Sequence, residues 1–345
     1  MHNGGVIDRV ADQLPPAAFS FVMAAGIVSV SLMMHDLLVL SRILMVLAIL
    51  GYLVLIGLTL RQLLHHRSRV RGNVSAPPSR FGYATFVAAS GVLGTRLVLL
   101  GVPVIPLVQL LVAISAAVVI GQWIVRATRR DVAPWWRVVD GSWFLAAVAC
   151  HSIGVLAASI AAVRPAAAVG LVVVALTAWV AGIVAYGIVL RGVLTRAGRR
   201  QIGAKDLTAP YWITMGACAI TVLDSVKLAV LPPEVVPPAV HQVVSWVGVG
   251  FWVLATLLIP VILAAGWWRH IRHRIPLDSP TTLWSIVFPL GMYDVASTLM
   301  ATTHQFWLAR VIGEVGVWIA LAAWLVTAVL LTSRIVALIR GPEPS

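Results

Sequence analysis

Ionisable side chains inside the apolar segments of this 345-residue chain are the first candidates for chemistry. Placing a charge in hydrocarbon is costly, so such residues mark either a solute path or an internal ion pair. On a solute path, Arg96 or Lys227 attracts an anion, and Asp294 or Glu314 takes up a proton. The alternative is pairing inside the protein, and two of the possible pairs stand three or four residues apart on one helix. The six residues are Arg96, Asp224, Lys227, Asp294, Arg310 and Glu314.

His151 lies nearer the middle of its apolar segment. An imidazole at that depth either hydrogen-bonds to a neighbouring helix or ligates haem or a metal. The sequence has no His-Glu-x-x-His zinc motif and no Gly-Lys-Ser/Thr phosphate loop. We therefore expect the hydrogen bond, with no catalytic residue, metal or cofactor. An intramembrane haem- or metal-binding protein or enzyme that uses His151 is the alternative.

Phe288 and Pro289 form the sharpest local feature, in the run Phe-Pro-Leu-Gly-Met-Tyr. Proline has no amide hydrogen and clashes with the preceding turn, so the sequence predicts a helix break here. At 1.5 Å per residue the break lies roughly 12 Å from Thr281, near mid-membrane. Such a break is tolerated where it is buried in protein or lines a cavity. Phe288 is thus either a core aromatic beside a kink or a side chain that occludes a pore.

The elements that carry these residues are apolar throughout. The chain is 60% hydrophobic and only 11% charged, which is typical of a membrane protein. It has room for one transmembrane domain over residues 1–345, with a short N-terminus, 1–15, and a C-terminal tail, 333–345. Apolar runs of about 20 residues predict ten transmembrane helices. The predicted spans are 16–34, 39–60, 81–100, 104–125, 139–160, 166–190, 209–230, 239–268, 281–302 and 306–331.

The net charge of +13 is concentrated in alternate connections between the spans. Three of the other connections, 101–103, 231–238 and 301–306, are free of Lys and Arg, and only Arg164 in the turn 161–165 and Arg42 after the first span depart from the pattern. This is the positive-inside pattern, and it places both termini in the cytoplasm. The basicity therefore reflects topology and contact with anionic lipid, and leaves no surface for nucleic acid. Asp140 and Ser142 lie at the start of the fifth span and are expected to cap its helix.

The odd- and even-numbered spans differ in residue type. Odd spans carry small and polar residues in mid-run, such as Ser29, Gly91 and Thr214, whereas even spans are richer in Leu, Ile and Val. Small residues let helices approach closely, and polar residues avoid lipid. We expect five consecutive helical hairpins, with the odd helices as an inner ring that encloses a pore.

Several short motifs resemble those of a known family. The opening Pro16-Ala-Ala-Phe19, Asp140-Gly-Ser-Trp143, Trp212-Ile-Thr-Met215 and the run from Phe288 to Tyr293 are similar to motifs of the tellurite-resistance/dicarboxylate transporter family, which is related to plant slow-type anion channels. The resemblance spans nearly the whole chain. In this sequence the third, fifth and seventh spans lack mid-run prolines, so any kinks there are expected from glycines.

The resemblance implies an all-α membrane protein with ten helices in five hairpins around a central pore, often as a homotrimer. It implies that odd helices line the pore and that Phe288 obstructs it. The pore or gate candidates are Phe288, Pro289, Phe19, Gly26 and Gly216.

The predicted function is a transporter or channel for small anions in the plasma (cytoplasmic) membrane. Its substrates are C4-dicarboxylates such as malate, or oxyanions related to tellurite resistance, and its transport is passive or proton-linked. Its partners are the anionic solute, the bilayer and further copies of itself. It is not expected to be an enzyme.

Overall fold

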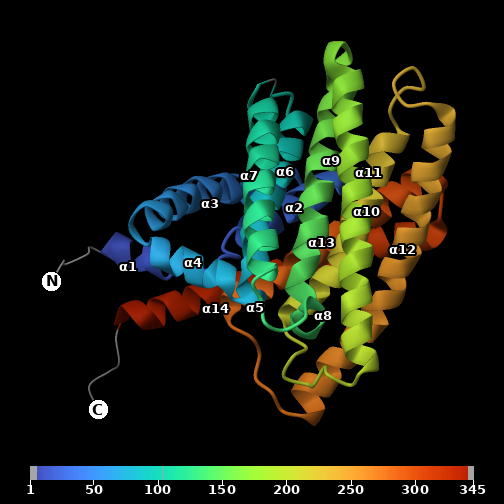
Figure 1. Cartoon of the computed structure of the whole chain (residues 1–345). Coiled ribbons are helices and arrows are strands. Elements are labelled where there is room, and N and C mark those ends of the chain that lie inside the picture. Colours follow the sequence, from blue (N-terminus) through green and yellow to red (C-terminus); the bar gives the residue numbers. More distant parts are fainter. Residues whose placement is uncertain (1–5, 103, 341–345) are drawn as a thin grey trace.

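The computed structural model of the protein describes residues 6–102 and 104–340, and every regular element in these residues is a helix (Figure 1). The α-helices are α1 Val6–Asp12, α2 Ser20–Met34, α3 Leu38–His65, α4 Arg67–Ser75, α5 Pro77–Arg80, α6 Ala84–Leu99, α7 Ile105–Thr128, α8 Trp135–Val138, α9 Leu145–Val163, α10 Ala168–Gly198, α11 Ile213–Ala229, α12 Pro238–Trp267, α13 Pro280–His304 and α14 Trp307–Arg340. Short turns join them: η1 Phe81–Tyr83, η2 Gly141–Phe144, η3 Pro165–Ala167, η4 Ala209–Trp212 and the π-turn η5 Trp268–Arg272.

Nine helices in the described residues are long and apolar enough to cross a bilayer. They correspond to the predicted spans two to ten. The first predicted span, 16–34, is helical only from Ser20, and α2 has 15 residues. At 1.5 Å per residue α2 is about 22 Å long, shorter than a hydrocarbon core of about 30 Å. Ten full-length spans are therefore not established by the structure.

The predicted helix break in α13 differs from the structure. The break at Pro289 is absent: α13 runs without interruption from Pro280 to His304. A proline ring is tolerated where neighbouring groups accept its bulk, and here it packs at the position of Gly216 on α11. Helix α14 continues to Arg340, which lies within the predicted C-terminal tail, 333–345. Residues 341–345 of that tail lie outside the described residues.

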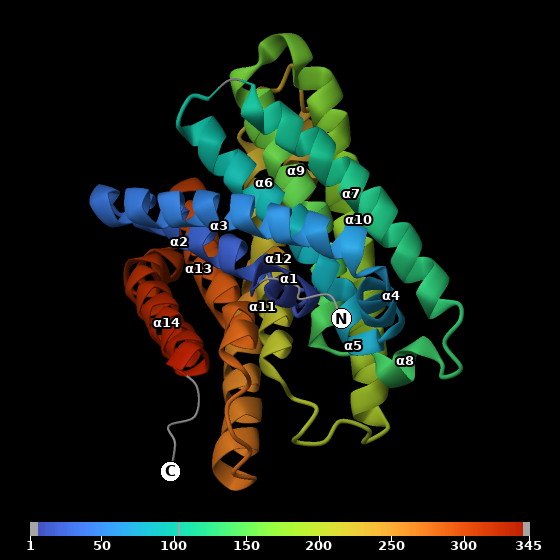
Figure 2. The same cartoon turned by 90° about the vertical axis from the view of Figure 1, so that its left-hand side faces the viewer.

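Five antiparallel hairpins make up the molecule: α2–α3, α6–α7, α9–α10, α11–α12 and α13–α14. In Figure 1 the tight turns of α6–α7, α9–α10 and α11–α12 lie at the top, and the longer connections after α10 and α12 lie at the bottom. We call these the turn end and the loop end. Helix α1 and the last part of α14 lie at the loop end (Figures 1 and 2).

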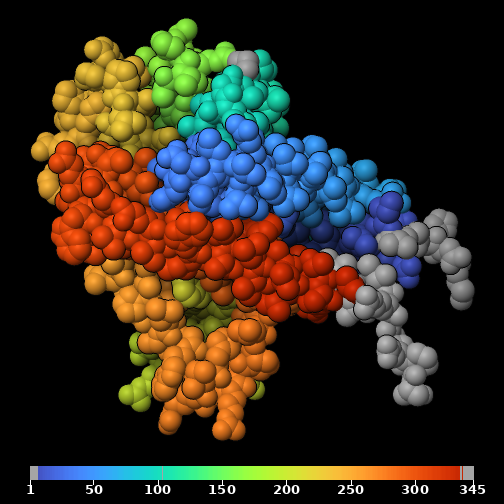
Figure 3. Space-filling view, turned by 180° about the vertical axis from the view of Figure 1, so that it is seen from behind, coloured from blue at the N-terminus to red at the C-terminus, as the bar shows by residue number. Residues whose placement is uncertain are grey.

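The helices sort into an inner and an outer layer. In α6, α9, α11 and α13, between 72% and 89% of the most apolar stretch is buried, against 11–33% in the outer helices α3, α7, α10, α12 and α14. Helix α2 is buried from Val22 to Leu32. Figure 3 shows α3 and α14 covering one face of the molecule. The expected division into inner odd and outer even helices is what the structure contains.

The inner helices form a closed ring, in which each contacts the next and α13 contacts α2. A glycine lies at each of the five contacts, where an added Cβ would come within 2.3–3.0 Å of the neighbouring helix. Glycine therefore sets the close approach all the way around the ring. The five contacts are Gly26 with Val92, Gly91 with Ser152, Gly154 with Asp224, Gly216 with Pro289, and Gly291 with Ile27.

Candidate functional site

A cavity of about 200 Å³ opens where the inner helices begin, at the loop end. All five inner helices, or the short turns that lead into them, contribute to its wall. Seven of its described lining residues carry hydroxyl groups, and none of them has a charged side chain. The hydroxyl residues are Ser20, Ser79, Thr85, Ser142, Thr281, Thr282 and Ser285.

A second cavity, of about 160 Å³, lies towards the turn end and is also lined by all five inner helices. Most of its wall is aliphatic. Lys227 of α11 is the one charged residue in its described lining, and Thr95 and Ser152 add hydroxyl groups. The two cavities therefore occupy the same ring at different depths.

The two cavities share no lining residue. On α13, Phe288 lines the loop-end cavity and Met292, about one turn later, lines the turn-end cavity. Phe288 is only 2% exposed, and Met23 on the facing helix α2 is 1% exposed. Both side chains are thus almost fully buried, and each lies about one helical turn from a residue that lines the turn-end cavity.

The electrostatics of both cavities favour an anion. The first turns of the inner helices surround the loop-end cavity, and a helix N-terminus carries a partial positive charge. Lys227 supplies a full positive charge to the turn-end cavity. No carboxylate lines either cavity among the residues that the structure describes. The hydroxyls of Ser20, Thr85 and Ser142 already donate to acceptors within the protein, so the favourable field comes from the helix N-termini and from Lys227.

Four of the predicted pore residues act at contacts or lie away from the axis. Gly216 and Pro289 pack against each other, and Gly26 packs against α6. Phe19 lines neither axial cavity. Its ring contacts Tyr52 and Phe86, with centroid distances of 5.8 and 5.0 Å, and faces an apolar pocket beside α3 and α7.

His151 links two inner helices through a buried hydrogen-bond network. Its Nδ1 lies 2.9 Å from Asp224 Oδ2, and its Nε2 lies 2.9 Å from Thr221 Oγ1. Thr221 donates its own hydrogen to the carbonyl of Ala217, so Nε2–H donates to Thr221 and the remaining contact shares a proton with Asp224. The expected interhelical hydrogen bond of His151 is confirmed, and both of its ring nitrogens are engaged.

Arg96 and Asp294 are both buried at the turn end without an ionic partner among the described residues. Arg96, 2% exposed, donates to the hydroxyls of Ser29 and Ser41 at 3.3 and 3.1 Å, so it does not extend to the surface. Asp294 lies beside Ser31 and His35 of α2. Neither carboxylate oxygen of Asp294 meets the geometry of a hydrogen bond.

The two same-helix ion pairs predicted from spacing do not form in the described residues. Asp224 contacts His151, and Lys227 lines the turn-end cavity instead. Arg310 and Glu314 lie on the exposed face of the outer helix α14, with no ion pair between them. The spacing was compatible with contact, but the interhelical partner of Asp224 is 73 residues away in the chain.

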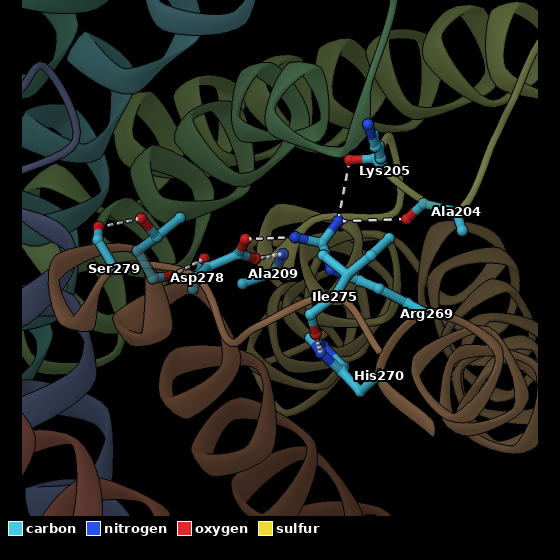
Figure 4. A network of polar contacts seen from close by, with 10 residues as sticks. Ala204, Lys205, Ala209, Arg269, His270, Ile275, Asp278 and Ser279 are labelled. Atoms are coloured by element: carbon cyan, nitrogen blue, oxygen red, sulfur yellow. Dashed lines mark hydrogen bonds and ion pairs between the residues drawn. The ribbon is translucent and has the colours of Figure 1, made fainter. Parts of the chain in front are cut away.

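Arginines that are buried or partly buried form ion pairs that hold the connections at the loop end, and no local sequence pattern indicates them. Figure 4 shows Arg269 donating to the carbonyl of Lys205 at 2.9 Å and to Asp278 at 2.7 Å, while Asp278 also accepts the amide of Ala209. This network ties the start of α11 to the connection before α13. Arg80 with Asp131 and Arg196 with Asp206 fasten two other connections.

The start of the fifth predicted span is capped as expected. Asp140 Oδ1 accepts the backbone N–H and the hydroxyl of Ser142, at 2.8 and 2.6 Å. Burial raises the pKa of Asp140 from its ordinary value, and the two hydrogen bonds act in the opposite direction. This cap positions Ser142, which lines the loop-end cavity.

Comparison with known proteins gives a match over nearly the whole chain. A family model described as a voltage-dependent anion channel, SLAC1, matches residues 13–332. Two relatives are "Uncharacterized membrane protein MT1776" of Mycobacterium tuberculosis strain CDC 1551 / Oshkosh and "Uncharacterized membrane protein Rv1735c" of strain ATCC 25618 / H37Rv. Each is 40% identical over 134 residues, which cover 39% of this chain and 68% of the relative.

Proposed function

Because the chain belongs to the SLAC1 family of voltage-dependent anion channels, we propose that it passes small anions along the axis of its inner ring, with Phe288 as the gate. Membership confirms the resemblance found in the motifs. The family consists of channels or transporters, and not enzymes. Anion passage through a bilayer is the family-level function; the path, the gate and the substrate are our proposals.

The observation that carries the proposal is the pair of axial cavities on either side of Phe288. Each is lined by all five inner helices, and none of their lining residues is shared. A Phe side chain that is 2% exposed fills the boundary. An apolar constriction of this kind excludes water and ions until it moves. The closed ring of glycine contacts supports a path that runs through one chain.

The size and lining of the cavities support a small anionic substrate. Pockets for drug-sized ligands have volumes of about 300–1,000 Å³. The two axial cavities, at about 160 and 200 Å³, are smaller than this. We propose chloride, nitrate and C4-dicarboxylates such as malate as substrates, with tellurite-related oxyanions as a second class. Lys227 and the hydroxyls of the loop-end cavity are the proposed contacts.

The remaining parts of the proposal concern assembly and coupling. We propose a homotrimer in the cytoplasmic membrane, with α2 as a tenth span and both termini in the cytoplasm. The Arg-rich connections at the loop end support that orientation. Asp294 is the proposed proton acceptor, because it is a buried carboxylate without a cationic partner. Asp294→Asn then abolishes pH-driven uptake, and retained coupling removes Asp294 from the mechanism.

The test of the gate is anion flux in proteoliposomes that contain the purified chain. Phe288→Ala is expected to raise flux at least about tenfold, across a panel of chloride, nitrate, malate, succinate and tellurite. Phe144→Ala is the matched control, because Phe144 is also fully buried but packs against Tyr186, away from both cavities. Unchanged flux in a folded Phe288→Ala protein overturns the gating role.

The alternative of a haem or metal protein centred on His151 has less support. Both ring nitrogens of His151 already have partners, so ligation requires breaking one of these hydrogen bonds. The described residues contain no group of three or more His, Cys, Asp or Glu side chains arranged to hold a metal. A visible absorption spectrum of the purified protein tests haem binding directly.

A further inference from the structure

A third cavity lies away from the ring axis, at the loop end between α3–α4 and the end of α7. Its volume is about 860 Å³, several times that of either axial cavity. This is within the range of ligand-binding pockets. The residues that line it are Leu63, Arg67, Val70, Arg71, Val74, Ser75, Trp123, Arg126, Ala127, Arg130 and Asp131.

Four arginines face this cavity in two pairs. Arg67 and Arg71 stand four residues apart on α4, and Arg126 and Arg130 stand four apart at the end of α7. Arg67 and Arg71 lie on one face of α4, because residues spaced by four on a helix are neighbours. Arg126 lies in the last turn of α7 and Arg130 in the turn that follows it, and both line the same cavity. All four are exposed, and none forms an ion pair among the described residues. Four guanidinium groups without ion pairs thus surround one space, and Arg67 Nε also donates to the carbonyl of Leu63 at 3.3 Å.

The one acid in the lining does not offset this charge. Asp131 accepts two hydrogen bonds from Arg80, at 2.7 and 2.9 Å. Arg80 is fully buried and also donates to Thr128 and to the carbonyl of Ser75. The buried Arg80 guanidinium therefore neutralises the charge of Asp131. Its contacts with Ser75 and Thr128 also hold the end of α4 against the end of α7. The four arginines therefore give the cavity an excess of positive charge, and the elements that carry them are held together by Arg80.

The rest of the wall is apolar and adjoins the membrane. Leu63 belongs to α3 and Trp123 to α7, and both helices are candidate membrane spans. Val70 and Val74 add an apolar strip along α4. The cavity therefore lies where hydrocarbon meets the head groups, a depth at which tryptophan is favoured. A small soluble anion would not contact these apolar residues favourably.

We propose that this cavity binds an anionic phospholipid of the bilayer. The four arginines hold the head-group phosphate, since a guanidinium group donates two parallel hydrogen bonds to a phosphate. The glycerol backbone and the first part of the acyl chains lie against Val70, Val74 and Trp123. Basic pockets between helices at the cytoplasmic face are suited to such lipids. The site contains no residue of the proposed anion path, so the lipid proposal can be tested independently of that path.

The test is the thermal unfolding midpoint of the full chain in detergent, with and without added lipid. Phosphatidylglycerol is expected to raise the midpoint of the wild-type protein by several degrees, because a ligand that binds only the folded state stabilises it. Phosphatidylcholine with the same acyl chains, inorganic phosphate and glycerol phosphate are expected to give no such shift. Native mass spectrometry is expected to show phosphatidylglycerol retained on the wild-type protein.

Variants locate the binding. In a protein with Arg67→Gln, Arg71→Gln, Arg126→Gln and Arg130→Gln, the phosphatidylglycerol shift and the retained lipid are lost. The matched control removes four exposed charges from other connections of the loop end, and keeps both. Its substitutions are Arg191→Gln, Lys205→Gln, Arg272→Gln and Arg274→Gln.

Two outcomes overturn the proposal. One is an equal shift in the four-arginine variant and in the control, which assigns the effect to general surface charge. The other is a shift with inorganic phosphate as large as with phosphatidylglycerol, which assigns the site to a soluble anion. If the fourfold variant does not fold, Arg67→Gln with Arg71→Gln provides the same comparison and is expected to lose about half of the shift.

Discussion

The inner helices of this protein are less hydrophobic than the outer ones. The four inner helices of spanning length have mean hydropathies of 1.3–2.0, whereas the five outer helices have values of 2.1–2.7. In a water-soluble protein the buried layer is the more apolar one. Here the solvent is lipid, which is as apolar as leucine, so burial of leucine brings no gain. The difference shows that the inner ring is held by close packing and polar contacts.

Glycine shows the same difference between the layers. At Gly91 on α6 an added Cβ would lie 2.6 Å from the carbonyl oxygen of Ser152, whereas at Gly187 on α10 it would meet nothing within 4 Å. One glycine is required by a neighbouring backbone, and the other faces the surroundings of the molecule. Substitutions at matched positions in the two layers can therefore break or sharpen the comparison.

Gly91→Ala is expected to have the largest effect. Its methyl group would clash with a backbone atom that cannot rotate away, so α6 and α9 must separate. We expect a loss of about 3 kcal/mol in unfolding free energy, at the upper end of the usual cost of overpacking. Unfolding followed by tryptophan fluorescence measures this loss. A Gly91→Ala protein as stable as wild type would show that the ring is not closely packed at this contact.

Asp224→Ala is expected to have the next largest effect on stability. It leaves His151 Nδ1 buried without a partner between α9 and α11. An unsatisfied buried polar group costs about 1–3 kcal/mol. Denaturation curves measure the loss, and His151→Ala combined with Asp224→Ala is expected to cost less than the sum of the two single changes. Additive single and double changes would mean that the two side chains do not interact.

Lys227→Met is expected to change flux more than stability. It removes the one charge in the described lining of the turn-end cavity. A unit charge acting over a few ångströms contributes about 1 kcal/mol, so anion flux should fall roughly fivefold. Lys205→Met is the control, because Lys205 is exposed in a loop-end connection and is the only other lysine in the chain. Equal flux in the two variants would remove Lys227 from the path.

Gly187→Ala is expected to have the smallest effect, and the opposite sign. Its methyl group meets no neighbour, and alanine loses less backbone entropy than glycine on forming a helix. We expect a gain of about 0.5 kcal/mol in unfolding free energy. A loss as large as that of Gly91→Ala would contradict the division into two layers, because it would place Gly187 in a tight contact.

The layers were predictable from sequence because they depend on residue type. Span length, the Arg-rich connections and the small residues of the odd helices are local properties, and they anticipated the hairpins and the inner ring. The contact between His151 and Asp224 was not predictable in the same way, because its partners lie on different hairpins. The same holds for Arg80 and Asp131, which are 51 residues apart. Nothing in the sequence showed that these loop arginines are buried.

Pro289 shows why a local rule failed. Proline removes one hydrogen bond from a helix, which predicts a break when the helix is considered alone. In the ring, the proline ring packs at Gly216, and α13 stays helical. Phe288 was identified by its place before that proline. Its position relative to the two cavities could not be predicted from the sequence, because the cavities are formed by all five inner helices.

The central claim is that Phe288 separates two compartments of one path. In a background with Cys150→Ala and Cys218→Ala, Ser285→Cys places a thiol in the loop-end cavity and Leu223→Cys places one in the turn-end cavity. A membrane-impermeant thiol reagent is expected to label each position from one side of the membrane only, and from opposite sides. Adding Phe288→Ala should make both positions reactive from either side. Labelling of both from one side with Phe288 in place would contradict the account.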